Sequence, residues 1–452
     1  MFCPKSVAVI GASRNPKKIG YELVSNILSG GYEGKLYPVN PEGADVMGLR
    51  SFTSVKQIPG EVDLAIIAVP AVYVEDVIED CGQKEIKAII VISSGFREVG
   101  NVELEEKVLS VVRKFGIRML GPNVFGLYYA PSRINATFGL SRVFPGNIAF
   151  ITQSGALGVA MMGWSTLYRI GVSAVISMGN KADIDESDML DYLTGDEKTK
   201  AVLIYIEGTK DGRKLIESLR NITQGKPVIV LKSGRTEQGA SAAASHTGSL
   251  AGSDQVYDAA FRQSGALRAF DFAQAFDWAK ITTLQPPPPN ENCLIITNGG
   301  GVGVMTTDAC EESGIKILPL PEDLQSEFKK LMPVFGNFKN PVDLTGQAYE
   351  ESYYNSVELA LKDSRIGSVI VLYCQTAITD PVAIAKAIAD ACESQRSDKT
   401  LVTSFVGGQQ CDDAMMKLDE RGIPAYPIPE RAVSALAAYY RWQRYRERMK
   451  KV

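Results

Sequence analysis

Short apolar segments without regular polar alternation recur along the chain. They read VAVIG, DLAIIAVP, KAIIVISSG, NIAFITQSG, AVLIYIEG, PVIVLKSG, CLIITNGGG and SVIVLYCQT, and most precede a segment with the period of a helix. Strands that are apolar on both faces are typical of parallel sheets covered by helices on both sides. The pattern therefore predicts an α/β protein built on parallel sheets.

Two breaks divide this pattern into three α/β domains. Four consecutive prolines in LQPPPPNENC, at 284–293, forbid helix and sheet alike. A softer break lies at 131–146, before the strand NIAFIT. A length of 452 residues suits roughly three domains. We expect these domains at 1–130, 145–284 and 291–452.

The second and third predicted domains share an internal repeat. IAFITQSGALGVAMM at 148–162 aligns with CLIITNGGGVGVMTT at 293–307, and both predict a buried strand, a tight turn and a helix. Each turn would bring backbone N–H groups and the positive end of a helix dipole to the carboxyl edge of a sheet, where an anion is favoured. The alternative is that the glycines only allow helix and strand to pack closely.

The composition argues against several classes of function. The 48 basic and 52 acidic residues give a formal charge of -4, so no basic surplus is available to bind nucleic acid or an anionic membrane. The seven cysteines are scattered and form no C-x-x-C pair, a pattern typical of reduced thiols rather than of disulfides or a zinc site. The strand SVAVIG begins so early that we expect no signal peptide, and no apolar run approaches a membrane span. We expect a cytoplasmic protein without a bound metal ion.

The chain contains a single histidine, His246, inside GASAAASHTGSLAGSD at 239–254. Gly, Ala and Ser leave a backbone free to change course. A neutral imidazole is an available nucleophile near neutral pH. His246 is therefore a candidate phosphoryl carrier on a loop able to move. Taken alone, a single loop histidine is more often a solvated surface residue.

The first predicted domain matches the dinucleotide-binding pattern G-x-G-x-x-G only weakly. Gly11 and Ser13 occupy the turn after the strand SVAVIG. A nicotinamide enzyme would also need an acidic residue at the end of the second strand to hold the ribose. That strand, GKLYPVNP, ends instead in Asn40 and Pro41, which argues against NAD and favours another ligand that carries phosphates.

Charged groups for such phosphates follow the same turn. Lys17 and Lys18 are candidate point charges, although lysines near a helix start are more often only solvated. The sequence contains no G-x-x-x-x-G-K-S/T loop and no clustered carboxylates for a magnesium ion. If a nucleotide phosphorylates the histidine, we expect a partner to hold that nucleotide.

A set of short motifs runs through all three predicted domains: GAS, VNP, SSGF, GPN, TQSG, YIEG, the SHTGSLAG loop, NGGG and NPVDLTG. Together they resemble the nucleoside-diphosphate-forming acyl-CoA synthetases, relatives of succinyl-CoA synthetase. Succinyl-CoA synthetase α subunits resemble only the first two domains, so the third domain favours the α subunits of ADP-forming acetate–CoA ligases. The resemblance implies a Rossmann-like CoA-binding domain followed by two flavodoxin-like, succinyl-CoA synthetase-like domains with parallel sheets.

The resemblance also implies roles for individual residues. CoA would be bound by Gly11, Ala12, Ser13, Asn40, Pro41, Val69, Pro70, Ser93, Ser94 and Gly95, with Asn123 near the thiol and acyl end. The two helix N-termini that hold the phosphate would be Gln153, Ser154 and Gly155, and Asn298, Gly299 and Gly300. His246 would be the phosphohistidine, and Glu207 the carboxylate that orients its imidazole and stabilises positive charge on it.

The activity implied by the resemblance converts acyl-CoA, ADP and phosphate into a carboxylic acid, ATP and CoA. An acyl phosphate would form first, and its phosphoryl group would pass to His246 and then to ADP. The family's ATP-grasp domains, which hold the nucleotide and Mg²⁺, are absent from this sequence, which implies a separate β subunit in a heterotetramer of two α and two β subunits. The alternatives are a CoA-binding regulatory protein of the same fold, disfavoured by His246 and Glu207, and a nicotinamide oxidoreductase. The choice of ADP or GDP belongs to the partner, and that of the acid to a few side chains.

Overall fold

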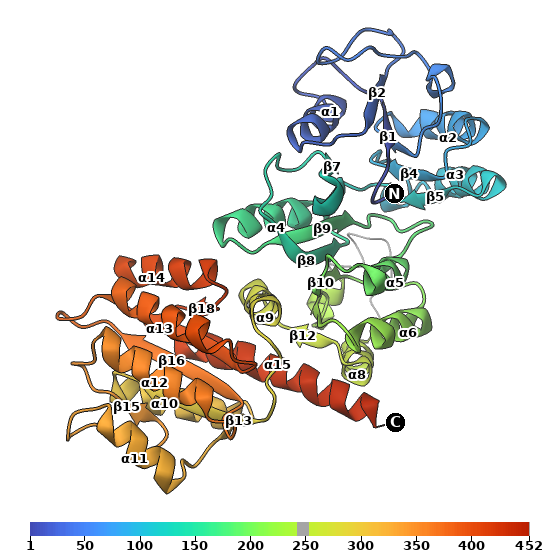
Figure 1. Cartoon of the computed structure of the whole chain (residues 1–452). Helices are drawn as coiled ribbons and strands as arrows, with labels where there is room; N and C mark the ends of the chain where they lie inside the picture. Colours follow the sequence, from blue (N-terminus) through green and yellow to red (C-terminus); the bar gives the residue numbers. More distant parts are fainter. Residues whose placement is uncertain (242–252, 452) are drawn as a thin grey trace. The chain divides into compact units, whose positions relative to one another are not determined.

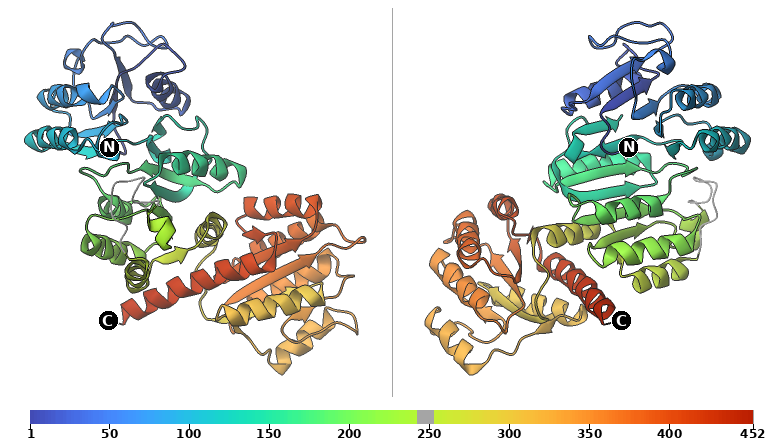
Figure 2. Two further views of the ribbon diagram at one scale, coloured as in Figure 1. Left: turned by 180° about the vertical axis from the view of Figure 1, so that it is seen from behind. Right: turned by 45° about the vertical axis from the view of Figure 1, so that its right-hand side comes forward.

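The computed structural model describes residues 1–241 and 253–451. Over these residues the chain forms three sheets of mainly parallel strands, with helices packed on them (Figure 1 and Figure 2). The contacts divide the chain into two compact units, Met1–Ala269 and Phe270–Val452. The predicted α/β class with parallel sheets is confirmed. Within the described ranges, no helix is both long enough and apolar enough to cross a membrane.

The first sheet has five parallel strands in the order β2-β1-β3-β4-β5. The strands are β1 (Ser6–Ile10), β2 (Lys35–Val39), β3 (Leu64–Ile67), β4 (Ala88–Val91) and β5 (Arg118–Leu120), and the helices are α1 (Ile19–Ser29), α2 (Val74–Gln83) and α3 (Val102–Phe115). β1, β3 and β4 are buried along their whole length, as expected of strands apolar on both faces. The chain leaves β1 in opposite directions to reach β2 and β3, which places the switch point of the sheet there.

The second sheet has the order β12-β11-β10-β8-β9-β6-β7 and is parallel except that β6 runs antiparallel to β7 and β9. Its strands are β6 (Gly126–Tyr129), β7 (Ile134–Thr137), β8 (Pro145–Thr152), β9 (Val172–Ser177), β10 (Ala201–Ile206), β11 (Val228–Lys232) and β12 (Leu267–Ala269). Its helices are α4 (Gly155–Leu167), α5 (Glu186–Gly195), α6 (Gly212–Thr223) and α8 (Asp254–Ser264). One hydrophobic core contains Val7 of the first sheet together with Leu127 and Ile151 of the second. The two sheets therefore form one compact unit.

The third sheet lies in the C-terminal unit and has the order β14-β13-β16-β17-β18, with β15 also paired to β13. Its strands are β13 (Asn292–Thr297), β14 (Lys316–Ile317), β15 (Val342–Asp343), β16 (Ser368–Cys374), β17 (Thr400–Val406) and β18 (Ala425–Tyr426). Its helices are α9 (Phe272–Leu284), α10 (Gly300–Glu312), α11 (Glu322–Lys330), α12 (Glu350–Lys362), α13 (Pro381–Gln395), α14 (Gln409–Glu420) and α15 (Pro429–Lys450). Although α9 precedes the proline run, it packs on α15, where Arg431 binds Asp277 through two hydrogen bonds of 2.6 and 2.7 Å.

Candidate functional site

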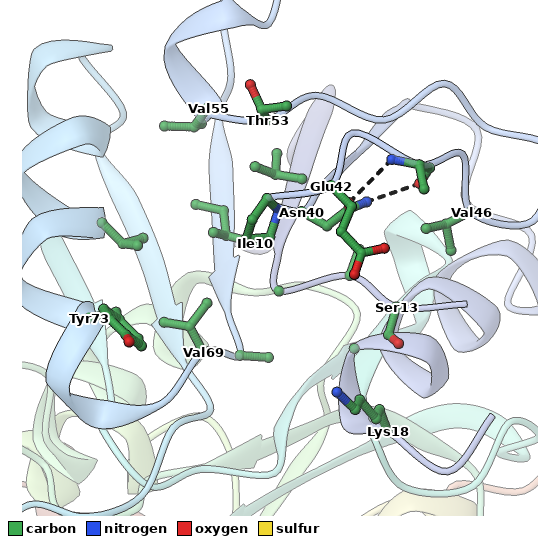
Figure 3. Close-up of a pocket in the computed structure, with 18 of the residues that line it drawn as sticks. Ile10, Ser13, Lys18, Asn40, Glu42, Val46, Thr53, Val55, Val69 and Tyr73 are labelled. Carbon is green, nitrogen blue, oxygen red and sulfur yellow. Dashed lines mark hydrogen bonds between the residues drawn. The ribbon is translucent and has the colours of Figure 1, made fainter. Parts of the chain in front are cut away.

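A cavity of about 980 Å³ opens at the carboxyl ends of β1, β2 and β3 (Figure 3). This is the switch point of the first sheet, where open α/β sheets bind their ligands. Apolar side chains such as Val39 and Val69 line it together with the polar Ser13 and Lys18. The volume and the mixed lining suit an organic ligand of nucleotide size.

Most of the predicted CoA-binding residues meet at this cavity. Its lining includes Gly11, Ala12, Ser13, Asn40, Pro41, Val69 and Pro70. Of the two candidate lysines, Lys18 is among the described residues that line the cavity and Lys17 is not. The backbone N–H of Lys17 donates to Asn15, at 3.0 Å.

The turn between β1 and α1 explains why these residues stand so close to the ligand space. Gly11 has a φ of +94°, and a Cβ at this position would collide with the carbonyl oxygen of Ala68. The N–H groups of Gly11 and Ala12 both donate to the carbonyl of Val39, at 2.9 and 3.2 Å. The turn therefore offers the cavity its later residues, from Ser13 onwards, rather than these two N–H groups.

The end of β2 shapes the opposite wall of the cavity. The Asn40 side chain donates to the carbonyl of Ala44 at 3.0 Å and accepts from its N–H at 3.3 Å, as the dashed lines in Figure 3 show. Sequence analysis missed Arg14 and Glu42, which also line the cavity and form an exposed ion pair of 3.7 Å. Arg14 directly follows Ser13, and Glu42 directly follows Pro41. Their positions next to motif residues could have indicated that they line the cavity.

The remaining predicted CoA-binding residues lie at the ends of β4 and β5. The Ser93 hydroxyl donates to the carbonyl of Val69 at 2.5 Å, and the N–H of Asn123 donates to the carbonyl of Ser93 at 2.9 Å. Ser94 is exposed beside them. These residues are therefore joined to the cavity wall at Val69 without lining the cavity themselves.

Gly95 in the same turn already has an internal partner. The N–H groups of Gly95 and Phe96 donate to the Glu98 carboxylate at 2.6 and 3.2 Å. These hydrogen bonds lower the pKa of Glu98 against the effect of its burial, which acts in the opposite direction, and Asn180 adds a further one. The backbone N–H groups of this turn thus hold a carboxylate of the protein itself.

The turn after β8 is the first of the two predicted anion sites. Thr152 both donates to the carbonyl of Ser154, at 2.9 Å, and accepts from its N–H, at 3.1 Å. Ser154 caps α4 through the N–H of Leu157, at 3.4 Å, and Gly155 is the first residue of that helix. The Gln153 side chain is half-buried and lies between this turn and the end of β10, so it can link the two.

Three hydrogen bonds make that link. The Gln153 amide oxygen accepts from the N–H groups of Glu207 and Gly208 at 2.8 and 3.2 Å, and its nitrogen donates to the carbonyl of Gly208 at 2.8 Å. The predicted catalytic carboxylate and the first predicted phosphate turn are thereby held next to each other.

The turn after β13 repeats the same plan. Thr297 both donates to the carbonyl of Gly299 and accepts from its N–H, each at 3.0 Å. The Asn298 side chain accepts from the N–H of Cys374 at 2.7 Å and donates to its carbonyl at 2.9 Å. Gly299 caps α10, which begins at Gly300, without a side-chain hydrogen bond. The predicted repeat of strand, turn and helix is confirmed down to these hydrogen bonds.

Glu207 is 7% exposed and stands among polar side chains at the end of β10. Tyr205 donates to its carboxylate at 3.3 Å, and the N–H of the following Thr209 donates to Tyr257 at 3.0 Å. The ammonium of the buried Lys232 lies 4.7 Å from the Tyr257 ring. Burial lowers the pKa of Lys232, and the carboxylates of Asp254 and Glu207 oppose that shift. Lys232 was not predicted as a functional residue. The indication in the sequence is a lysine at the end of the apolar strand PVIVLK.

His246 lies at 242–252, outside the described residues. Its pairing with Glu207 therefore stays a prediction. Asn340 and Asp343 belong to the NPVDLTG motif, and their side chains make hydrogen bonds to main-chain groups. Asn340 donates to the carbonyls of Cys293 and Leu318 at 2.9 and 3.0 Å, and Asp343 accepts from the N–H of Thr345 at 2.9 Å.

Comparisons with known proteins point in one direction. Three family models match in turn: a CoA binding domain over 5–130, a succinyl-CoA ligase like flavodoxin domain over 145–282, and a ligase-CoA domain over 293–450. These matches cover all three sheets of the structure and the turns described above.

Individual relatives match over the whole chain. ADP-forming acetate–CoA ligase I subunit alpha of Pyrococcus furiosus is 51% identical over 100% of this chain and 98% of its own length. ADP-forming acetate–CoA ligase of Methanocaldococcus jannaschii is 40% identical over 97% of this chain, which covers 62% of that longer protein. The structure of dinucleotide-forming acetyl-coenzyme A synthetase 1 of Ca. Korarchaeum cryptofilum, in complex with phosphate and ADP, has a TM-score of 0.97 and 46% identity over 100% of this chain and 97% of that one.

Proposed function

We propose a function from one premise: the chain belongs to the family of ADP-forming acetate–CoA ligase α subunits. Its reaction is the conversion of acyl-CoA, ADP and phosphate into a carboxylic acid, ATP and CoA. The observation that carries the proposal is the end-to-end match to the Pyrococcus furiosus I subunit alpha, at 51% identity. The cavity at the switch point of the first sheet supplies the place for CoA.

The CoA site comprises the cavity and the turns after β4 and β5, which adjoin it. Ser13, Asn40 and Val69 support this assignment because they line the cavity. Lys17 and Lys18 are the two candidates for contact with the phosphates of CoA. Lys18 is the better supported of the two because it lines the cavity. Asn123 marks the thiol and acyl end, where its N–H is tied to Ser93.

Chemistry begins at the turn after β8. A phosphate oxygen attacks the thioester carbonyl carbon, the carbon–sulfur bond breaks, and a proton passes from phosphate to the CoA thiolate, which leaves an acyl phosphate. The N-terminus of α4 at Gln153, Ser154 and Gly155 provides fixed dipoles for the charge on the phosphoryl group. The turn at Asn298, Gly299 and Gly300 is proposed as a second anion site of the same type.

Phosphoryl transfer to His246 follows. An imidazole nitrogen attacks phosphorus, the bond to the acyl oxygen breaks, and the carboxylate leaves. Glu207 orients the ring and stabilises its positive charge, a role supported by its burial and by the hydrogen bonds that fix its backbone. An ADP oxygen then takes the phosphoryl group from the imidazole.

The nucleotide and Mg²⁺ belong to a partner subunit of the ATP-grasp type, in a heterotetramer of two α and two β subunits. This part of the proposal is supported by the Methanocaldococcus jannaschii ligase, of which this chain covers only 62%. The domain ranges 1–130, 145–284 and 291–452 also remain proposals. A cytoplasmic location is supported by the cysteines, all seven of which are free thiols.

The test begins with the isolated chain in a calorimeter. It should bind CoA and should not bind ATP tightly. With the partner, Mg²⁺ and γ-labelled ATP, it should acquire an acid-labile, base-stable phosphate that His246→Asn removes. CoA binding without any label would indicate the regulatory protein instead, and a label that survived His246→Asn would exclude the phosphohistidine.

A further inference from the structure

The segment 178–184, which joins β9 to α5, lies along the end of the first sheet. The N–H groups of Asn180 and Ala182 donate to the carbonyls of Pro122 and Gly121, both at 2.9 Å. The N–H of Ile184 donates to the carbonyl of Met119 at 3.2 Å. The main chain of this segment therefore fastens the second sheet to the turn that carries Asn123.

Lys181, in the middle of the segment, reaches the catalytic side of the second sheet. Its side chain is 9% exposed, and its Nζ donates to the carbonyl of Gly208 at 2.6 Å. Gly208 follows Glu207 directly, so this hydrogen bond holds the Gly208–Thr209 peptide unit, one residue beyond the proposed catalytic carboxylate. Lys181 itself has a φ of +54°, a backbone conformation that residues other than Gly seldom adopt without a local reason.

The partner of Lys181 is a carboxylate that is wholly buried. An oxygen of Glu186, which is 0% exposed, lies 3.0 Å from the Lys181 ammonium. Among the described residues, neither oxygen of Glu186 accepts a hydrogen bond. Buried ion pairs contribute little to stability relative to apolar side chains of the same volume, because two charges must lose their water. Stability alone is therefore a poor reason for this pair.

The neighbour of Lys181 contacts the other end of the reaction path. The Asn180 side chain accepts from the Asn123 side chain at 3.3 Å. It also donates to the carboxylates of Glu98 and Glu105 at 2.6 and 2.9 Å. Two consecutive residues thus contact the proposed acyl end and the residue that follows the proposed phosphoryl-transfer carboxylate.

We infer that Lys181 is a positioning residue for Glu207. Its ammonium, held by Glu186, fixes the carbonyl of Gly208 and with it the direction of the Glu207 carboxylate, while Asn180 ties the same segment to Asn123. The inference rests on the proposed function, in which Glu207 orients the imidazole. A displacement of about 1 Å in such a group can slow a reaction by about a hundredfold.

The experiment uses the complex with its partner and compares three variants. Lys181→Met with Glu186→Leu removes both charges at once, so no carboxylate is left unpaired and the fold should survive. Its kcat should fall by about tenfold to a hundredfold with little change in the KM for CoA, because the cavity is untouched. Lys181→Arg keeps a donor and should recover much of the rate.

Lys214→Met is the matched control. This lysine forms ion pairs of 3.0 Å with Asp185 and Asp188, which are close in sequence to the same segment and are not part of the Glu207 turn. Its kcat should stay within about twofold, the range expected for partly exposed ion pairs. A double variant with the kcat of the control would overturn the inference.

A second readout separates this inference from the proposed function. Amide hydrogen exchange of the chain alone should be faster at Glu207, Gly208 and Thr209 in the double variant than in Lys214→Met. Unchanged exchange there would overturn the positioning role. A wild-type complex that exchanged as expected but never acquired the histidine label would overturn the proposed function, while Lys181 would still be shown to hold the turn.

Discussion

The turns after β8 and β13 have the same hydrogen-bond plan but different neighbours. In both, a threonine hydroxyl accepts from the N–H two residues further on. The intervening amide side chain, Gln153 or Asn298, accepts from a backbone N–H at the end of the adjacent strand in the sheet. At that strand end the first turn has the carboxylate of Glu207, whereas the second has the thiol of Cys374. Both copies therefore have the same backbone geometry, but only the first has the proposed catalytic carboxylate.

The strand on the other side of each turn differs too. Ser177 pairs with Thr152 in the first copy, and Asp343 pairs with Thr297 in the second. The Asp343 carboxylate lies within 3.1 Å of the place where a Cβ on Gly300 would stand, at the start of α10. A carboxylate at a helix N-terminus satisfies the helix dipole. We therefore expect the second turn to be the weaker of the two proposed anion sites, because Asp343 places a negative charge beside it.

Substitutions at the two strand ends should differ most in their effect on the rate of histidine labelling. Glu207→Gln should slow the labelling of His246 by about a hundredfold or more, because the amide cannot stabilise the imidazolium charge. Cys374→Ser, at the equivalent position, should change the rate less than about twofold. Rapid-quench measurement of the acid-labile label in the assembled complex gives both numbers. Similar rates for the two variants would remove the distinction between the turns.

A negative charge placed at each helix cap should have the second-largest effect on the rate of phosphoryl transfer. Ser154→Asp keeps a capping side chain but adds a negative charge, so phosphoryl transfer should slow by about tenfold to a hundredfold while calorimetry finds unchanged CoA affinity. Gly299→Asp should slow it less than about threefold, since Asp343 already stands at that N-terminus. Ser154→Asn is the neutral control. A stronger effect at Gly299 would reverse the ranking of the two turns.

A smaller effect should appear when the second turn loses its own carboxylate. Asp343→Asn keeps an acceptor for the N–H of Thr345 and removes the charge beside α10. Phosphate affinity of the chain should rise by about threefold to tenfold, the range of a single charge at a helix terminus. Titration with inorganic phosphate at low ionic strength measures it, and Ser177→Ala in the first copy serves as control. No gain in affinity would mean that Asp343 does not compete for this site.

The smallest effect concerns the buried cation near the first turn. Because burial lowers the pKa of Lys232 below 10.5, the unfolded chain binds more protons than the folded chain between the two values. This group should therefore make the free energy of unfolding rise with pH across that window, and Lys232→Met should make the slope less positive. Denaturant unfolding at a series of alkaline pH values tests it, with Lys35→Met, at an exposed position, as the comparison. A wild-type slope identical to that of Lys232→Met would refute the shift.

The sequence was informative where a pattern is local. The strand, turn and helix at 148–162 and 293–307 could be predicted because apolar runs, polar turns and helical periods are properties of neighbouring residues. The cavity residues followed from the resemblance of their motifs to those of the family. Lys18 could not be preferred over Lys17, since the choice depends on where α1 begins.

Contacts between distant residues left no such pattern. The carbonyl of Gly208 that binds Lys181 and the carboxylate of Glu98 that binds Asn180 are far away in sequence, and nothing near either donor indicates them. The antiparallel pair β6 and β7 was also missed, because GLYY and INAT are shorter than the apolar runs of the parallel strands. Tertiary packing decides such features, and one sequence carries little trace of it.

The shared core of the first two sheets makes their stability a common property. Val7, Leu127 and Ile151 pack in one cluster, so heat or denaturant should melt both sheets in a single cooperative transition. A ligand that binds only the folded state raises the midpoint of the whole cooperative unit. Coenzyme held at the first sheet would therefore also protect the Glu207 turn from unfolding, even though that turn belongs to the second sheet.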